Sequence, residues 1–255
     1  MVMRGMARLL SSGGDDGRIS ADIDILVPAS AREAAVAALT GLGYEIMKGL
    51  NDHPRPVVVG RTRDVGTIDV HAALLPEYMR LSYESLTEHC SVVRTGTGEV
   101  LVPSATCQLM FNIVHDQLHD GDYWRGVIDV RHLLDLRAVA NEGIDWQLLE
   151  QLFPPGCARH ALHVQLGTAT GLLNVAIPEA VCGGTWSRLQ RVRRRYQLSR
   201  PILASLFTGV TVLLDPPPDG AGIRTRSGER RSRLNWPSIR RRISRGIFPV
   251  NYGKL

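Results

Sequence analysis

Two carboxylates stand two residues apart at the head of an apolar, β-branched run, Asp22-Ile23-Asp24-Ile25-Leu26-Val27. Residues i and i+2 of a β-strand point to the same face of a sheet, so Asp22 and Asp24 are predicted to lie side by side. Neighbouring carboxylates repel each other and are costly near a core unless a cation neutralises them. The pattern therefore predicts a divalent metal site, with Mg²⁺ (or Mn²⁺) as the expected ion, because Mg²⁺ takes carboxylate oxygens and keeps positions open for phosphates.

A third carboxylate, Asp69, lies in a second strand-like run, Thr67-Ile68-Asp69-Val70-His71. If the two strands are neighbours, the three carboxylates can bridge two metal ions roughly 3.5–4 Å apart, an arrangement that clamps an in-line phosphoryl or nucleotidyl displacement. His71 shares a strand face with Asp69. It is expected either to orient that carboxylate or the acceptor, or to be a structural histidine.

Read together, these segments resemble a known family. The sequence is similar here to the polymerase-β-type nucleotidyltransferase superfamily. The likeness rests on Gly17-Arg18-Ile19-Ser20-Ala21, the paired aspartates that follow, a helix, and then Ile68-Asp69-Val70-His71. Within it, the likeness is to a bacterial family of uncharacterised nucleotidyltransferases. The later stretch His115-Asp116-Gln117-Leu118-His119, with Tyr123-Trp124-Arg125, resembles the helical half of that family. The likeness spans residues 10–150.

The resemblance implies an α+β fold: a small polymerase-β-like mixed sheet with flanking helices, followed by a helical C-terminal half. It also implies metal-dependent transfer of a nucleotide from an NTP to a hydroxyl or phosphate acceptor. Asp22, Asp24 and Asp69 would be the catalytic and metal-binding residues, and Arg18 would pair with the triphosphate. The acceptor is left open between a small molecule, a peptide, a protein and RNA.

Such enzymes place a Gly-Ser or Lys-Gly turn ahead of the paired carboxylates, and the nearest equivalent here is Leu10-Ser11-Ser12-Gly13-Gly14. Ser11 or Ser12 is predicted to sit near the phosphates, with Gly13 and Gly14 letting backbone N–H groups approach them. Only 21 residues precede Asp22, so the chain is either shortened relative to its relatives or degenerate at this turn. A catalytically degenerate nucleotide- or RNA-binding protein and a toxin-like tRNA nucleotidyltransferase are therefore the alternatives.

The pattern along the chain predicts three parts: an α/β domain over residues 1–100, a helical domain over 101–214, and a Pro-rich, then basic, flexible tail over 215–255. Strands are expected at 22–27, 44–47, 56–61, 67–72 and 99–102. A helix is expected at 31–42, with Ser30 and Glu33 forming a capping box. Helices follow from Ser104 onward.

Composition is that of an ordinary globular protein, with 44% hydrophobic and 22% charged residues among 255. The four cysteines form no C-x-x-C pair, which indicates neither a disulfide framework nor a zinc site of that type, and a reducing cytoplasm is expected. The longest apolar run, residues 201–214, is shorter than the roughly 20 residues needed to span a bilayer, so no transmembrane segment is expected.

Basic residues gather toward the C-terminal end. Residues 221–255 hold ten Lys/Arg and one acid, and a second cluster of arginines occupies residues 188–200. These runs predict either an anionic partner or a solvated face. His115 and His119, one helical turn apart, can bind Zn²⁺. The alternatives for this pair are a cleft-lining helix, with His115 facing the nucleotide or acceptor, and plain surface.

Overall fold

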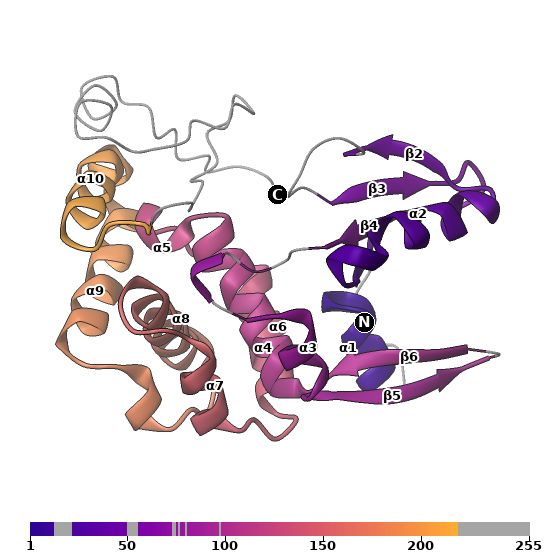
Figure 1. Ribbon diagram of the computed structural model, residues 1–255. Coiled ribbons are helices and arrows are strands. Elements are labelled where there is room, and N and C mark those ends of the chain that lie inside the picture. Colours follow the sequence, from indigo (N-terminus) through magenta and orange to yellow (C-terminus); the bar gives the residue numbers. More distant parts are fainter. Residues whose placement is uncertain are drawn as a thin grey trace. The chain divides into compact units, whose positions relative to one another are not determined.

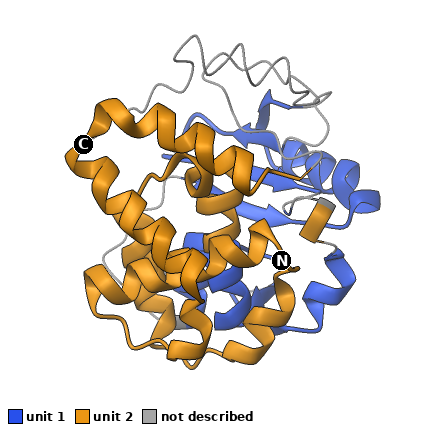
Figure 2. Cartoon of the chain, turned by 90° about the vertical axis from the view of Figure 1, so that its left-hand side faces the viewer, with its two compact units in different colours: residues 1–75, 80–111 blue, residues 76–79, 112–255 orange. Residues whose placement is uncertain are grey.

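The computed structural model describes residues 1–12, 22–49, 56–72, 75, 77–79, 81–96 and 98–218. The chain divides into two compact units, residues 1–75 with 80–111 and residues 76–79 with 112–255 (Figure 2). It passes from the first unit to the second inside one helix, α4 (Ala105–Ile113), which begins after the predicted boundary at residue 100. The basic tail over 221–255 lies outside the described residues.

The first unit contains a small mixed sheet of four strands (Figure 1). The strand order is β1-β4-β3-β2, and their bounds are Asp22–Leu26 for β1, Glu45–Lys48 for β2, Val57–Gly60 for β3 and Thr67–His71 for β4. Strands β1 and β4 are parallel, whereas β3 pairs antiparallel with both β4 and β2. The predicted α+β class and mixed sheet are confirmed.

The two faces of this sheet have different roles. Val57, Val59 and Val70 point to one face and form a buried core with Val36 of α2 (Arg32–Gly41). The alternation of β-strands then turns Asp24 and Asp69 to the opposite face. Burial of the alternating apolar side chains under α2 therefore fixes the strand register, and this register brings the carboxylates together.

Helix α2 begins differently from the prediction. A 3-10 turn, η1 (Ala29–Ala31), follows Pro28, and the N-cap of α2 is Ala31, which makes no side-chain capping hydrogen bond. The predicted capping box of Ser30 and Glu33 is wrong because Ser30 is already inside this turn, where the N–H of Ala31 donates to the carbonyl of Pro28 at 2.9 Å.

The first residues of the chain run beside β1. The N–H of Leu26 donates to the carbonyl of Met1 at 2.8 Å, and the N–H of Met3 donates to that of Asp24 at 3.0 Å. Helix α1 (Arg4–Ser12) follows, and Ala7 of this helix packs with Val2 and Val102. Val102 belongs to a separate antiparallel hairpin, β5 (Cys90–Thr95) and β6 (Gly98–Pro103), and a short helix α3 (Tyr83–Thr87) precedes β5.

The second unit is helical. Its elements are η2 (Glu77–Met79), the end of α4, η3 (Val114–His119), α5 (Asp122–Arg125), α6 (Val130–Ala140), α7 (Trp146–Leu152), α8 (Cys157–Leu173), η4 (Glu179–Cys182), α9 (Thr185–Ser199), η5 (Pro201–Leu203) and α10 (Ala204–Leu214). Helix α8 is the most buried of the longer helices and packs against α6, α9, η3 and η4. No helix among the described residues has both the length and the apolar character to cross a membrane.

Candidate active site

The register of β1 and β4 places the predicted carboxylates next to each other. Asp24 is directly opposite Asp69, and Asp22 is opposite Thr67. One ligand atom each from Asp24, Asp69 and His71 lies within 4.8 Å of the others. This group therefore brings together two of the predicted aspartates and His71.

Asp22 joins this group through a hydroxyl. Thr67 Oγ1 lies 2.9 Å from Asp22 Oδ1 and 3.4 Å from Asp69 Oδ1, so it bridges the carboxylates of two strands. Asp22 is exposed, whereas Asp69 is half-buried. The three carboxylates thus form a row that runs from solvent toward the buried Asp24.

Asp24 is the most enclosed of the three, with 6% of its surface exposed. Its oxygen Oδ1 lies 3.0 Å from His71 Nε2, and Arg4 Nη1 donates to both carboxylate oxygens at 3.2 Å. A buried carboxylate is tolerated only when such partners replace its hydration. His71 is thus in hydrogen-bond contact with Asp24, and one of its ring nitrogens also lies within 4.8 Å of a carboxylate oxygen of Asp69.

Arg4 reaches Asp24 because of an unusual backbone. It is the first residue of α1 and has a positive φ of 52°, a conformation that residues other than glycine adopt at an energetic cost. The chain changes there from the extended residues beside β1 to a helix, and Gly5 follows. Sequence reasoning missed this Arg4-Gly5 turn, although the dipeptide carries the same charge and glycine as a Lys-Gly pair.

Of the residues predicted to form the phosphate-binding turn, Ser11 and Ser12 belong to helix α1, and Gly13 and Gly14 lie outside the described residues. Ser11 and Ser12 are the last two residues of α1. The Ser11 hydroxyl donates to the carbonyl of Ala7 at 3.0 Å and accepts from Gln108 Nε2 at 2.9 Å. Gly13, Gly14 and Arg18 fall in the segment 13–21, outside the described residues.

The electrostatics at Asp69 favour a cation. Burial raises the pKa of this carboxyl above its ordinary value, and the negative charges of Asp24 and then Asp22 raise it further. A divalent cation among these groups would relieve that repulsion. Carboxylate oxygens are also the donors that Mg²⁺ and Mn²⁺ prefer, so the residues present fit such an ion.

A small mixed sheet with these carboxylates on the face opposite the α2-covered core, continued in sequence by a helical half, is consistent with a nucleotidyltransferase domain. The chain belongs to the family described as uncharacterised nucleotidyltransferase, whose model matches residues 5–174. No curated protein and no solved structure matches the chain. Membership of this family supports nucleotidyl transfer as the general function.

Two arginines of α9, Arg193 and Arg194, differ from the sequence expectation of a solvated or anion-binding run, whereas Arg188 and Arg195 are exposed. Arg194 is fully buried, and its Nη1 donates to Gln165 Oε1 at 3.3 Å while its Nη2 donates to Gln117 Oε1. Arg193 is also buried and donates to the carbonyls of Tyr123 and Trp124. Burial lowers the pKa of Arg194 to about 10, so it stays charged at neutral pH. These two arginines tie helices together.

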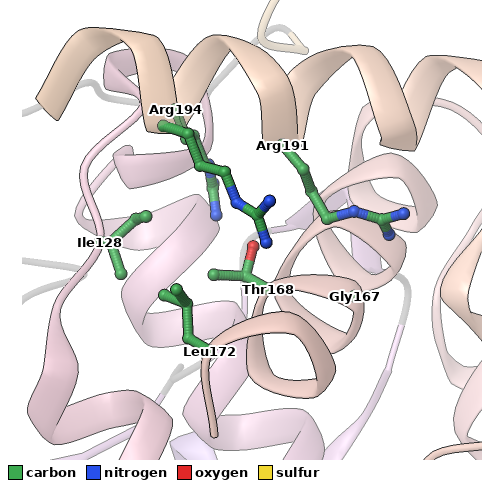
Figure 3. A pocket seen from close by; sticks show the side chains of 7 residues that line it. Ile128, Gly167, Thr168, Leu172, Arg191 and Arg194 are labelled. Atoms are coloured by element: carbon green, nitrogen blue, oxygen red, sulfur yellow. The ribbon is translucent and has the colours of Figure 1, made fainter. Parts of the chain in front are cut away.

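A small cavity lies where α9 crosses α8 (Figure 3). Arg191 and Arg194 extend from α9 toward Gly167 and Thr168, and a side chain at Gly167 would collide with the Arg191 guanidinium. The cavity measures about 10 Å³, which is room for about one water molecule. It is therefore too small for a nucleotide, and it reflects close packing of arginines against glycine.

Proposed function

We propose that this protein is an Mg²⁺-dependent nucleotidyltransferase that moves a nucleotide from an NTP to a hydroxyl or phosphate acceptor. The observation that carries the proposal is the pairing of Asp24 with Asp69 across parallel strands, with Asp22 and His71 on the same face. Three carboxylates with one open, solvent-facing end can hold two divalent ions for an in-line displacement. Bound Mg²⁺ would supply charge neutralisation for the triphosphate and a lowered pKa for the attacking hydroxyl.

The surrounding side chains have distinct roles in this proposal. Asp69, whose pKa is raised, accepts the proton of the acceptor hydroxyl. Thr67 holds Asp22 and Asp69 at a fixed separation. Arg4, at the start of α1, would bind the triphosphate together with Arg18 and the Ser11–Gly14 segment, since guanidinium groups bind phosphate oxygens in a fork.

The test measures nucleotide binding before turnover, because the acceptor is not identified. The full chain is titrated calorimetrically with each NTP, with and without Mg²⁺, and Asp24→Asn and Asp69→Asn are compared with it. Asp64→Asn is the matched control, because Asp64 is a carboxylate of the same unit that accepts a hydrogen bond from Arg61 in the loop between β3 and β4. We expect Mg²⁺-dependent binding that both site variants lose and the control retains. Binding that survives in both site variants would overturn the assignment.

Transfer itself is then followed with NTP labelled at the α-phosphate and, separately, at the γ-phosphate, using pooled cellular small molecules and RNA as acceptors. Label from the α-position in a product, with release of pyrophosphate, is the expected result. Transfer of label only from the γ-position would mean that a bare phosphoryl group moves, and the nucleotidyl assignment would then be wrong.

The Arg4–Asp24 ion pair favours one alternative, a catalytically degenerate nucleotide-binding protein. A guanidinium that permanently neutralises Asp24 would remove one metal ligand while still attracting a triphosphate. In that case NTP binds equally well without Mg²⁺, and Asp69→Asn leaves binding unchanged. The same titrations therefore separate the two functions.

The basic tail over 221–255 remains the sequence-based candidate for contact with an anionic partner such as tRNA. Deleting it should reduce retention of RNA on a filter, with the reduction larger at low salt because phosphate contacts release counterions. Unchanged retention would remove the reason to favour an RNA acceptor.

A further inference from the structure

A second group of metal-ligating side chains lies in the helical unit, separate from the carboxylates of the sheet. Ligand atoms of His115, His119 and Asp120 lie within 4.8 Å of one another. His115 Nδ1 is 3.7 Å from Asp120 Oδ2, and His119 Nδ1 is 3.1 Å from Asp120 Oδ1. All three are partly exposed, with 26%, 45% and 31% of their side chains accessible, so a cation can enter from solvent.

The local backbone explains why the three side chains meet. Residues 114–119 form a π-helix, η3, and the N–H of Asp120 donates to the carbonyl of His115 at 2.9 Å. In a π-turn the hydrogen bond joins residue i to residue i+5, so residue i+5 lies above residue i. In an α-helix, residues i+3 and i+4 occupy that position. The wide turn thus places His119 and Asp120 together over His115, and such turns occur frequently at functional sites.

The imidazole rings of this cluster also lie as close together as the rings of histidines that bind one metal ion. The imidazoles of His115 and His119 are stacked with centroids 5.3 Å apart, and the ring of His132, from α6, lies 5.6 Å from that of His115. Nδ1 of His132 is buried and makes no hydrogen bond among the described residues.

Asp120 is ionised under ordinary conditions. Burial opposes its charge, but the hydrogen bond from His119 and the charges of His115, His119 and His132 outweigh that cost and lower its pKa to about 2. In a metal complex Asp120 would supply the anionic oxygen, and the two imidazoles would supply nitrogens in their neutral form, because a protonated imidazole does not bind a cation.

We propose that His115, His119 and Asp120 form a binding site for a late first-row divalent cation, Zn²⁺ in the first place. Two imidazoles and a carboxylate are the ligand set of open zinc sites, with a fourth position left for water or an incoming oxygen. Ligand atoms on a tetrahedral Zn²⁺ lie about 3.4 Å apart, given bonds of about 2.0–2.1 Å. Side-chain rotations that move the ligand atoms by about 1 Å would therefore bring them to the distances that Zn²⁺ requires. Nitrogen donors select this cation over Mg²⁺, which the carboxylates of the sheet suit better.

The test uses the full chain without an affinity tag, stripped of metal and titrated with Co²⁺ as a spectroscopic stand-in for Zn²⁺. In a buffer with excess Mg²⁺, which the carboxylates of the sheet suit, we expect one Co²⁺ per chain with the visible absorption of a site of low coordination number, and displacement of this Co²⁺ by Zn²⁺. His119→Ala and Asp120→Asn should each weaken binding by more than about tenfold, because even partners behind the ligands commonly contribute 10–100-fold.

Two controls locate the site. His160→Ala removes a histidine of the same unit that faces a carboxylate, with Nδ1 2.8 Å from Asp215 Oδ2, and it should leave Co²⁺ binding unchanged. Asp24→Asn, in the sheet, should also leave it unchanged. His119 is 45% exposed, so its replacement is expected to leave the helical circular dichroism intact. An absent Co²⁺ spectrum, one that persists in both His119→Ala and Asp120→Asn, or one lost in Asp24→Asn would overturn the proposal.

Discussion

Arg4 donates from Nη1 to both carboxylate oxygens of Asp24, each at 3.2 Å, and it does so from a backbone conformation that few arginines adopt. The residue is thus held in place by the strand-like residues before it and the helix after it. A cation supplied by the chain already contacts the carboxylate that the proposed function assigns to a metal ion. Arg4 and a metal ion would therefore compete for Asp24, so replacing Arg4 tests whether a metal ion binds there.

Replacing Arg4 by methionine should destabilise the metal-free protein by about 1–3 kcal/mol, because it leaves the buried Asp24 with fewer charged partners. Mg²⁺ should then stabilise Arg4→Met more than the unchanged protein, since the carboxylate is open to the ion. Urea unfolding with and without Mg²⁺ measures both effects.

Arg94→Met is the control for that experiment. Arg94 also forms an ion pair, with Glu99 at 3.1 Å, but 86% of its side chain is exposed. Its replacement should change stability by no more than about 0.5 kcal/mol and should show no dependence on Mg²⁺. Equal responses of the two variants to Mg²⁺ would argue against metal binding at Asp24.

Thr67→Val tests the hydroxyl that bridges Asp22 and Asp69. The change keeps the β-branched shape but removes the hydrogen bonds at 2.9 and 3.4 Å. We expect Mg²⁺ affinity to fall by about 10–100-fold, as it does when hydrogen bonds behind metal ligands are removed, while the fold is retained. Thr40→Val, which alters a helix-surface hydroxyl bonded to the carbonyl of Ala37, should have no such effect.

Arg194→Leu tests the structural role of α9. The change removes the guanidinium that binds Gln117 and Gln165 and leaves their buried amide oxygens without this donor, so it should cost about 1–3 kcal/mol in the free energy of unfolding. Arg188→Leu, on the same helix, should cost no more than about 0.5 kcal/mol, because that side chain is 69% exposed. Wild-type stability of Arg194→Leu would contradict the helix-tying role.

The thiols of Cys90 and Cys157 should react slowly in the folded protein. Burial raises the pKa of each to about 11, with nearby Cys107 adding to the shift at Cys90 and Asp215 at Cys157. At pH 8 fewer thiolates are present than for an ordinary cysteine, so alkylation should be about tenfold slower or more. The alkylation rate should keep rising as the pH increases toward 11, because more of each thiol is then ionised. Mass spectrometry of samples alkylated with and without urea measures the difference, and equal rates would contradict it.

The alternating strands were predictable because their side chains face two different environments. Asp22, Asp24, Asp69 and the valines of β3 follow a period of two, so strand positions and the carboxylate face could be inferred before the register was known. Strand β5 was missed because nearly all its side chains are exposed or half-buried, with no alternation to detect. Its partner β6 includes the buried Val102 and was found.

Two features of the site could not be inferred from local pattern. The Arg4-Gly5 turn follows only three extended residues, too few for a periodic signal, and its backbone is set by the hydrogen bonds of Met1 and Met3 to β1. The buried state of Arg194 depends on Gln117 and Gln165, residues from two other helices. A run of charged residues is interpreted as solvent-exposed unless the residues that contact it from distant parts of the chain are known.

The residues beside β1 also determine how this sheet can meet another molecule. A free strand edge offers unpaired N–H and carbonyl groups to any passing chain, which is a common route to aggregation. Met1 and Met3 occupy those groups on β1, while at the opposite end β2 carries Glu45, Lys48 and a register irregularity between Ile46 and Lys48. The segment that aims Arg4 at Asp24 therefore also protects the protein against edge-to-edge association.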